Sequence, residues 1–392
     1  MQHTADTPAR FDLGLTEAQE ARAARLHTDS IVFDWLSQHV GGPNIFAAYP
    51  DALQAEFRAL LDREGPGYRT YFKAMYWPYQ MAYEGRSQLV RDWYFASGMT
   101  CGAYHLKVHD GEETPEEAAL ARYGSMPWLR LITTAAEIRK AKADRVVALY
   151  ANCQPTEPIP RNLKAIDCAY GKGLRSLMLT YNRMDHVGVG CTERVDAGLS
   201  MFGVDVVRRC EDLGIIVDTS HCGHLTTMDA CKLARRPVNA NHTCAKAVSA
   251  VARAKSDDAL KAVAGTGGII GVVAVPNFIS TQPEPTVNHM LDHIEYIAGL
   301  VGWQHVSLGT DWPLQVTKEA LIRSMGAYWA ELGFRPGDRM EEAAATARTV
   351  GFEDYRELPN ITRGMVARGF SDEQIGGILG ENALRVFQEI CG

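Results

Sequence analysis

Eight short segments rich in Val, Ile and Leu recur along the 392-residue chain, and helix-like segments lie between most of them. This alternation is typical of βαβ units, in which helices join parallel strands. The predicted strands span residues 31–36, 100–106, 146–152, 175–181, 215–220, 237–242, 268–275 and 305–311. No GxGxxG or GxxxxGK motif follows any of them. An α/β fold with a closed (β/α)8 TIM-like barrel and additional helices is therefore favoured over an open nucleotide-binding sheet.

No linker, low-complexity tract or internal repeat divides the chain, which predicts one domain over residues 1–392. We expect the barrel at roughly 28–320 and a helical tail at 321–392. Residues 40–94 are too many for one crossover and are rich in aromatic side chains. They predict a helical excursion that covers the barrel mouth or forms a subunit contact.

Composition excludes several classes of partner. The net charge is −7 and no Lys/Arg-rich segment is present, which disfavours nucleic acid and anionic membrane surfaces. No apolar segment approaches the roughly 20 residues of a membrane span, and the N-terminus has no signal-peptide pattern. The nine cysteines are scattered without CxxC spacing, which predicts reduced thiols and a cytoplasmic location.

Histidines close two consecutive predicted strands, at His221 and His242, and Asp311 closes the last. The carboxyl ends of parallel barrel strands lie on one face, so two imidazoles delivered there could share a metal ion. Asp311 could then accept a proton from a metal-bound water. The other polar side chains at predicted strand ends are Asp34, Gln154, Tyr181, Asn182 and Asp218.

Each of these residues also has a purely structural interpretation. A single histidine at a strand end is more often a hydrogen-bonded packing residue than a ligand. Two on neighbouring strands, with Asp311 on the last strand, favour the ligand interpretation. Asp218 is equally consistent with bracing the His221 loop. Arg253 could clamp a carboxylate with two parallel hydrogen bonds or lie in solvent.

Four motifs carry a family resemblance: GIIVDTSH ending at His221, NHTCAKAV from Asn241, HVSLGTDW containing Asp311, and LGENALRVF near the C-terminus. With them the chain resembles the membrane (renal) dipeptidase family, peptidase family M19 of the amidohydrolase superfamily, from about His27 to Phe387. The resemblance implies a (β/α)8 barrel, dipeptide hydrolysis at two zinc ions and a homodimer. It implies that His221 and His242 are ligands of one zinc. Asp311 would be a metal ligand and proton acceptor, and Arg253 would bind the substrate carboxylate.

The chain departs from this family pattern at four positions. Leu36 and Gln38 stand where the family has a His and an Asp ligand, and Gln154 stands where it has a bridging Glu. Tyr181 replaces the substrate-contacting histidine of the L-T-H-N motif. Two ions about 3–4 Å apart need negative charge between them, which a neutral amide does not supply. The resemblance is therefore to a divergent bacterial branch, and a binuclear centre is disfavoured.

We expect a metal-dependent hydrolase of dipeptides or dipeptide-like small amides with one divalent ion, zinc being the first expectation, while a metal-free site stays open. His221, His242 and Gln154 would hold the ion, Asp311 and Tyr181 would be catalytic, and Arg253 and Asn182 would bind a small substrate with a carboxylate. The alternatives are an isomerase, epimerase or lyase on the same scaffold, or a catalytically inactive ligand-binding homologue.

Overall fold

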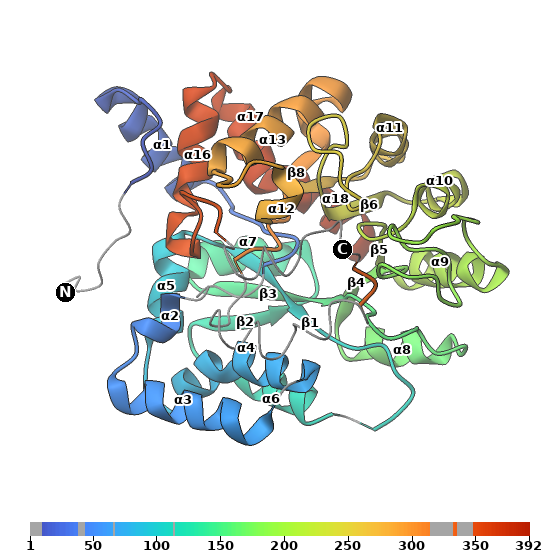
Figure 1. The fold of residues 1–392 in the computed structure, drawn as a ribbon, viewed down its shortest axis with the longest axis horizontal. Helices are drawn as coiled ribbons and strands as arrows, with labels where there is room; N and C mark the ends of the chain where they lie inside the picture. The colour runs from blue at the N-terminus through green and yellow to red at the C-terminus, as the bar shows by residue number, and fades with distance from the viewer. Residues whose placement is uncertain (1–9, 38–43, 66, 113, 314–331, 335–347) are drawn as a thin grey trace.

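The computed structural model describes residues 10–37, 44–65, 67–112, 114–313, 332–334 and 348–392. These residues form a mixed α/β fold built on one parallel sheet with the strand path β1-β3-β4-β5-β6-β7-β8 and β2 paired to β3 (Figure 1). The strands are β1 (Cys101–His105), β2 (Leu129–Ile132), β3 (Val147–Cys153), β4 (Leu174–Met178), β5 (Ile216–Asp218), β6 (Val238–Thr243), β7 (Ile270–Val272) and β8 (Val306–Leu308).

Seven of the eight predicted strands correspond to strands of this sheet. β3 is buried along its whole length, as expected for a parallel strand covered on both faces, and it registers Ala103 against Tyr150 and His105 against Asn152 on β1. β2 was not predicted. It is only four residues long, LRLI, and its two middle residues are partly exposed, so it lacks the continuous apolar pattern of a buried strand.

The predicted first strand, residues 31–36, is not a regular strand, so this prediction is wrong in detail. The segment makes two single parallel bridges, Phe33 with Cys101 of β1 and Asp34 with Leu308 of β8. Its ladder is interrupted because the Phe33 N–H donates to Leu379 from the C-terminal region, at 2.8 Å. The Asp34 carboxylate also accepts the Leu36 N–H, which turns the chain.

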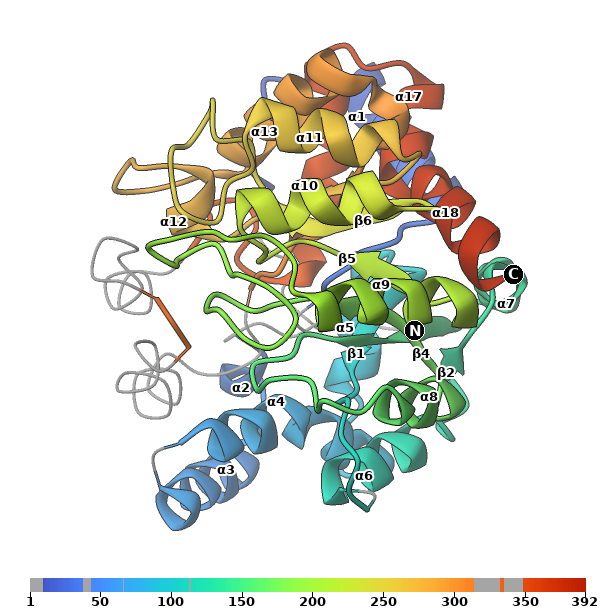
Figure 2. The same ribbon diagram turned by 90° about the vertical axis from the view of Figure 1, so that its right-hand side faces the viewer.

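Helices lie on both sides of the sheet, with α3, α4 and α6 grouped on one side and α13, α16 and α17 on the other (Figures 1 and 2). They are α1 (Glu17–Asp29), α2 (Asn44–Ala47), α3 (Asp51–Glu64), α4 (Tyr68–Tyr83), α5 (Leu89–Ser97), α6 (Pro115–Tyr123), α7 (Ala135–Asp144), α8 (Lys164–Gly171), α9 (Met201–Leu213), α10 (His224–Leu233), α11 (Asp257–Gly265), α12 (Pro276–Ile279), α13 (Val287–Val301), α16 (Pro359–Ala367), α17 (Asp372–Gly376) and α18 (Asn382–Cys391). Of the helices in the described part of the chain, none is long and apolar enough to cross a membrane.

The predicted aromatic excursion is helical and forms α2 to α5 within the described residues. Its aromatic rings pack on one another, for example Phe46 on Phe57 with ring centroids 4.2 Å apart and Phe57 on Trp77 at 5.2 Å. The hydroxyls of Tyr79 and Tyr94 are hydrogen-bonded at 2.5 Å inside this cluster. These aromatic side chains belong to the same hydrophobic core as Leu129 of β2 and Val147 of β3.

The C-terminal LGENALRVF motif contacts the segment of residues 31–36 and the start of β8. Gly380 lies so close to Ile31 that a Cβ would be 2.3 Å from the Ile31 carbonyl oxygen, which explains the need for glycine there. The Asn382 amide donates to the carbonyls of Trp303 and Val306 at the start of β8. Of the predicted helical tail, residues 321–331 and 335–347 lie outside the described residues, and α16, α17 and α18 are helical as expected.

Candidate active site

The structure brings together the two histidines that close neighbouring strands. His221 follows β5 and His242 is part of β6, and their ring centroids are 5.1 Å apart with an interplanar angle of 57°. Both side chains are buried. Parallel strands end on the same edge of the sheet, so this pairing follows from the topology.

A carboxamide orients the His221 ring. His221 Nδ1 lies 2.7 Å from Asn182 Oδ1, and the Asn182 amide nitrogen donates to the Leu332 carbonyl at 3.1 Å, which fixes the orientation of the amide. The amide oxygen can only accept, so the His221 proton is on Nδ1 and Nε2 is unprotonated. Asn182, predicted to bind substrate, therefore uses both ends of its amide within the protein.

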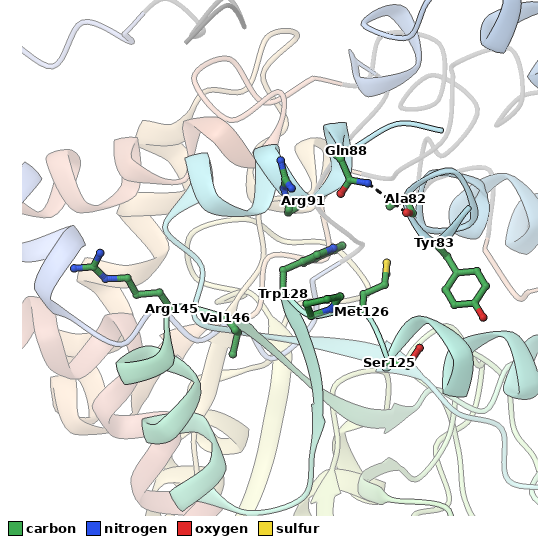
Figure 3. Close-up of a pocket in the computed structure, with 10 residues that line it drawn as sticks. Ala82, Tyr83, Gln88, Arg91, Ser125, Met126, Trp128, Arg145 and Val146 are labelled. Carbon is green, nitrogen blue, oxygen red and sulfur yellow. Dashed lines mark hydrogen bonds between the residues drawn. The ribbon is translucent and has the colours of Figure 1, made fainter. Parts of the chain in front are cut away.

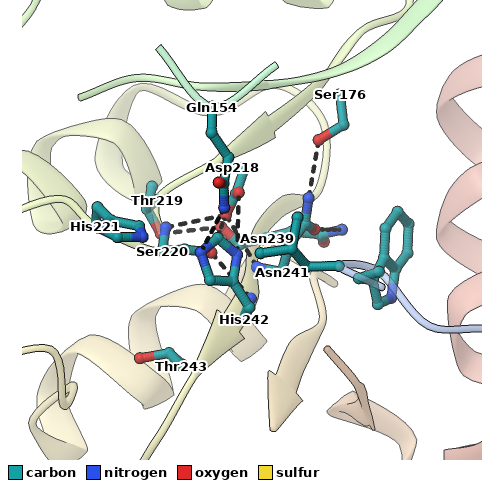
Figure 4. A network of polar contacts seen from close by, with 12 residues as sticks. Gln154, Ser176, Asp218, Thr219, Ser220, His221, Asn239, Asn241, His242 and Thr243 are labelled. Atoms are coloured by element: carbon teal, nitrogen blue, oxygen red, sulfur yellow. Dashed lines mark hydrogen bonds and ion pairs between the residues drawn. The ribbon is translucent and has the colours of Figure 1, made fainter. Parts of the chain in front are cut away.

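His242 lies between an amide and a carboxylate (Figure 4). Its Nε2 is 2.9 Å from the Gln154 amide nitrogen, and its Nδ1 is 3.9 Å from Asp218 Oδ2. Neither Nδ1 nor Asp218 Oδ2 has a hydrogen-bond partner among the described residues. An amide N–H can only donate, so Nε2 accepts and the proton is on Nδ1, directed at Asp218. Both imidazoles thus have an unprotonated Nε2.

The D-x-S-H motif connects the ends of β5 and β6. Asp218 Oδ1 accepts from the Ser220 N–H at 2.9 Å, the Ser220 hydroxyl at 2.5 Å and the Asn241 N–H at 2.9 Å. The Ser220 hydroxyl oxygen in turn accepts the His242 N–H at 2.9 Å. Burial raises the pKa of Asp218, which these hydrogen bonds oppose. Asp218 braces the His221 loop as its structural interpretation predicted, and it also faces His242.

Two buried cations lie behind the histidine pair. The Arg253 guanidinium donates to the Ser220 carbonyl and, at 3.0 Å, to the His242 carbonyl, while its Nε has no hydrogen-bond partner among the described residues. Lys255 Nζ donates to the Cys222 carbonyl and the Thr227 hydroxyl. Burial, and then the positive charge of Arg253, hold the pKa of both imidazoles well below the usual range. The histidines are therefore neutral at neutral pH, the state that binds metal.

Tyr181 and Asp311 occupy two further positions around these strand ends. The Tyr181 ring stacks on His221, with centroids 4.1 Å apart and an interplanar angle of 20°. Asp311 lies just beyond β8, where its N–H donates to the Leu36 carbonyl at 2.8 Å. Among the described residues no three His, Cys, Asp or Glu side chains form a group that could hold a metal ion, so Asp311 does not form such a group with the two histidines.

Sequence reasoning overlooked two residues near the site. His105 ends β1, and burial lowers its pKa to about 4, while its charge is among those that lower the pKa of His242. It is the second-last residue of the predicted strand 100–106, so a search of the strand ends could have found it. No pattern in the sequence around Lys255 predicts its burial, because the side chain is enclosed only in the folded structure. Two departures from the family pattern fall at the predicted first strand. Of these, Leu36 is buried, and Gln38 lies outside the described residues.

A separate cavity of about 710 Å³ lies at the opposite ends of the strands (Figure 3). Trp128 and Val146, which line it, directly precede β2 and β3. Figure 3 shows Arg145 directed away from Met126 and Trp128. No His, Asp or Glu lines this cavity, so it does not hold the acid–base groups described above.

Known proteins share this fold. Three solved structures resemble the chain: an amidohydrolase from Pseudomonas aeruginosa (TM-score 0.70, 22% identity, covering 94% of this chain and 99% of that one), the probable dipeptidase PvdM from Pseudomonas aeruginosa (0.68, 17%, 96% and 99%) and a metallo peptidase from Rhodobacter sphaeroides liganded with a phosphinate mimic of the dipeptide L-Ala-D-Ala (0.62, 20%, 92% and 100%). At these identities the likeness shows a common fold.

The model of the membrane dipeptidase family, peptidase family M19, matches residues 94–320, which is more than half of the chain. The enzymes of this class are dipeptidase-like metallohydrolases. The chain belongs to the membrane dipeptidase family, which confirms the resemblance drawn from its motifs.

Two imidazoles and one amide are the groups at this site that could coordinate a metal ion. His221 and His242 each present an unprotonated Nε2, and each Nδ1 faces a buried oxygen, the arrangement that orients metal-binding imidazoles. Gln154 could add a carboxamide oxygen once its amide turns, since its nitrogen now faces His242. Gln154 brings no charge that could bridge a second ion.

Proposed function

We propose that the protein is a metal-dependent hydrolase of dipeptides or dipeptide-like small amides that uses one divalent ion, with zinc as the first candidate. The observation that carries the proposal is the pair of neutral imidazoles with centroids 5.1 Å apart, each with Nδ1 directed at a buried oxygen. Family membership supports the class of reaction, and the neutral donor set supports a single ion.

His221, His242 and Gln154 would hold the ion. When bound, the ion would polarise the substrate carbonyl and lower the pKa of a water molecule. Asp311 accepts the proton of the attacking water, and Tyr181, stacked on His221, donates a hydrogen bond to the developing oxyanion. These roles rest on the family motif and on the position of each residue at a strand end.

Arg253 is the group proposed to receive a substrate carboxylate. The guanidinium carries five N–H donors, and two of them bond backbone carbonyls. Its Nε has no hydrogen-bond partner among the described residues. The buried positive charge still favours an anionic substrate in the field around the imidazoles. The substrate is therefore a small molecule with a carboxylate, and neither nucleic acid nor a membrane is a partner.

The proposal extends to the architecture of the protein. We infer that the sheet closes into a (β/α)8 barrel through residues 33–34, because these residues bridge to both β1 and β8. The single domain over residues 1–392, the cytoplasmic location and the homodimer stay predictions from the sequence.

Metal analysis tests the single-ion site. We expect about one equivalent of a divalent ion per chain in protein purified without chelator, and loss of that ion in a His221→Ala His242→Ala double variant. A Cys168→Ala variant is a control, because Cys168 is an exposed thiol on α8. Two equivalents, or a double variant that keeps its ion, would contradict the proposal.

Hydrolysis of a dipeptide panel tests the reaction. The panel includes L-Ala-D-Ala, because one structural neighbour is liganded with a mimic of that dipeptide. Asp311→Asn is expected to lower kcat by about 100-fold or more while leaving the fold intact, because the proton acceptor is lost. Unchanged turnover in this variant would remove Asp311 from the mechanism.

One observation favours a second candidate, a metal-free isomerase, epimerase or lyase. His242 Nε2 is already occupied by the Gln154 amide, and no group of three ligating side chains forms among the described residues. Such an enzyme would keep its activity after exhaustive chelation, whereas the proposed hydrolase would lose it and regain it with added zinc.

A further inference from the structure

Asp34 is a fully buried carboxylate at the junction of residues 31–36 with β8. Its Oδ1 accepts the Leu36 N–H at 3.1 Å and the Thr310 N–H at 2.9 Å. Its Oδ2 accepts the Thr310 hydroxyl at 2.5 Å and the Tyr355 hydroxyl at 3.4 Å. Four hydrogen-bond donors therefore contact the Asp34 carboxylate. Three of them belong to Leu36, whose carbonyl accepts the Asp311 N–H, and to Thr310, which directly precedes Asp311.

Asp311 itself has a backbone conformation that non-glycine residues rarely adopt, with φ of 51°. This left-handed conformation is unfavourable for a residue with a side chain and persists only where the surroundings impose it. The Asp311 N–H donates to the Leu36 carbonyl at 2.8 Å, and the Thr310 carbonyl accepts from Ala274 at 2.7 Å. The same Leu36 donates its N–H to Asp34.

We propose that Asp34, with Leu36 and Thr310, forms a clasp that positions the Asp311 carboxyl for its reaction. The inference rests on the proposed role of Asp311 as proton acceptor. In this Asp34 clasp, the carboxylate holds Thr310 by both its N–H and its hydroxyl, and Leu36 holds the Asp311 N–H. Thr310 and the Asp311 N–H are thereby held in place, which keeps the backbone of Asp311 in its left-handed conformation.

Two substitutions at Thr310 separate positioning from folding. Thr310→Val removes the hydroxyl that bonds Asp34 and keeps the shape, so kcat for L-Ala-D-Ala should fall about 10- to 100-fold with KM little changed. Thr310→Ser keeps the hydroxyl and should restore most of kcat. Thr100→Val is the matched control, because the Thr100 hydroxyl accepts the Val32 N–H at 3.2 Å at the other end of the same segment. It should leave kcat unchanged.

A double variant distinguishes failure of the clasp from failure of the proposed function. If the clasp acts through Asp311, Thr310→Val should lower kcat no further in an Asp311→Asn background. A large loss in Asp311→Asn with normal kcat in Thr310→Val would overturn the clasp and keep the proposed function. Normal kcat in Asp311→Asn would overturn the proposed function.

Thermal unfolding provides a measurement that needs no substrate. Asp311→Gly relieves the left-handed conformation and should raise Tm by about 1–3 °C in the otherwise unaltered chain. In the Thr310→Val background, where the backbone can relax, the gain should shrink toward zero. Equal gains in both backgrounds, or a lower Tm in Asp311→Gly, would overturn the clasp even if L-Ala-D-Ala is not turned over.

Discussion

At the scale of the residue, two neighbours of His242 determine which of its ring nitrogens carries the proton. The Gln154 amide donates to Nε2 at 2.9 Å, and Asp218 Oδ2, which has no hydrogen-bond partner among the described residues, faces Nδ1 at 3.9 Å. The proton therefore stays on Nδ1 and Nε2 keeps its lone pair. The same amide also competes with any ion for that lone pair, because it must turn before the ion can bind. In the proposed single-ion site, Gln154 is thus the residue expected to control metal affinity most directly.

Gln154→Glu should bind a divalent ion about 10-fold tighter or more, because a carboxylate supplies the negative charge that the amide lacks. Competition titration of zinc against a chelator at pH 8 measures the Kd. Gln154→Met is the matched control, since it has similar size and neither charge nor an N–H donor. A Kd that is unchanged or weaker in Gln154→Glu would contradict this account of the site.

At the scale of the element, one buried histidine joins three helices. His27 on α1 lies with Nε2 2.8 Å from the Ser97 carbonyl on α5 and Nδ1 2.7 Å from the Thr362 hydroxyl on α16. The carbonyl accepts, so Nε2 carries the proton and the Thr362 hydroxyl donates to Nδ1. Gly98 has φ of 70°, and a Cβ there would lie 2.6 Å from Nε2, so the following glycine makes room for the ring.

Burial lowers the pKa of His27 from 6.5 to about 4. Because the pKa in the folded state is below that of the unfolded chain, the stabilisation is present above pH 6.5 and is lost as the pH falls toward 4. Between pH 7 and pH 5 the protein should lose about 2 kcal/mol more of its unfolding free energy than a His27→Gln variant. Urea unfolding of both proteins at the two pH values measures this difference. Parallel losses would show that His27 does not titrate in this way.

At the scale of the whole molecule, the C-terminal helix completes the interior near the start of the sheet. Phe387 on α18 packs on Phe33, Trp35 and Tyr150 with ring centroids 5.6–6.3 Å away. The Tyr150 hydroxyl donates to the Trp35 carbonyl within the same cluster. Residues near the two ends of the chain thus share one core, so the C-terminal motif stabilises the entire fold.

Phe387→Ala should destabilise the protein by about 3–5 kcal/mol, because it opens a cavity among fully buried rings. Gln388→Ala, an exposed position on the same helix, should change the unfolding free energy by less than about 0.5 kcal/mol. Urea unfolding of the two variants measures both values. A loss below about 1 kcal/mol for Phe387→Ala would mean that the cluster collapses to fill the space.

Local patterns were enough to predict the class of fold and the pair of histidines. The period of apolar residues and the rule that parallel strands end on one edge both act over short stretches of chain, so His221, His242 and seven strands could be predicted. The same rule, applied to β1, would have included His105. The four motifs taken together were enough to predict the family.

Hydrogen-bond partners were decided only by the tertiary structure. Asn182 was expected to bind substrate, and its amide oxygen lies 2.7 Å from His221 Nδ1. Both terminal nitrogens of Arg253 bond backbone carbonyls. The Asp34 carboxylate meets Thr310, 276 residues away along the chain. Which donor reaches which acceptor depends on segments that only folding brings together, and burial then sets the pKa of each group. The sequence alone determined which side chains reach the strand ends, and the packed molecule decided what each of them touches.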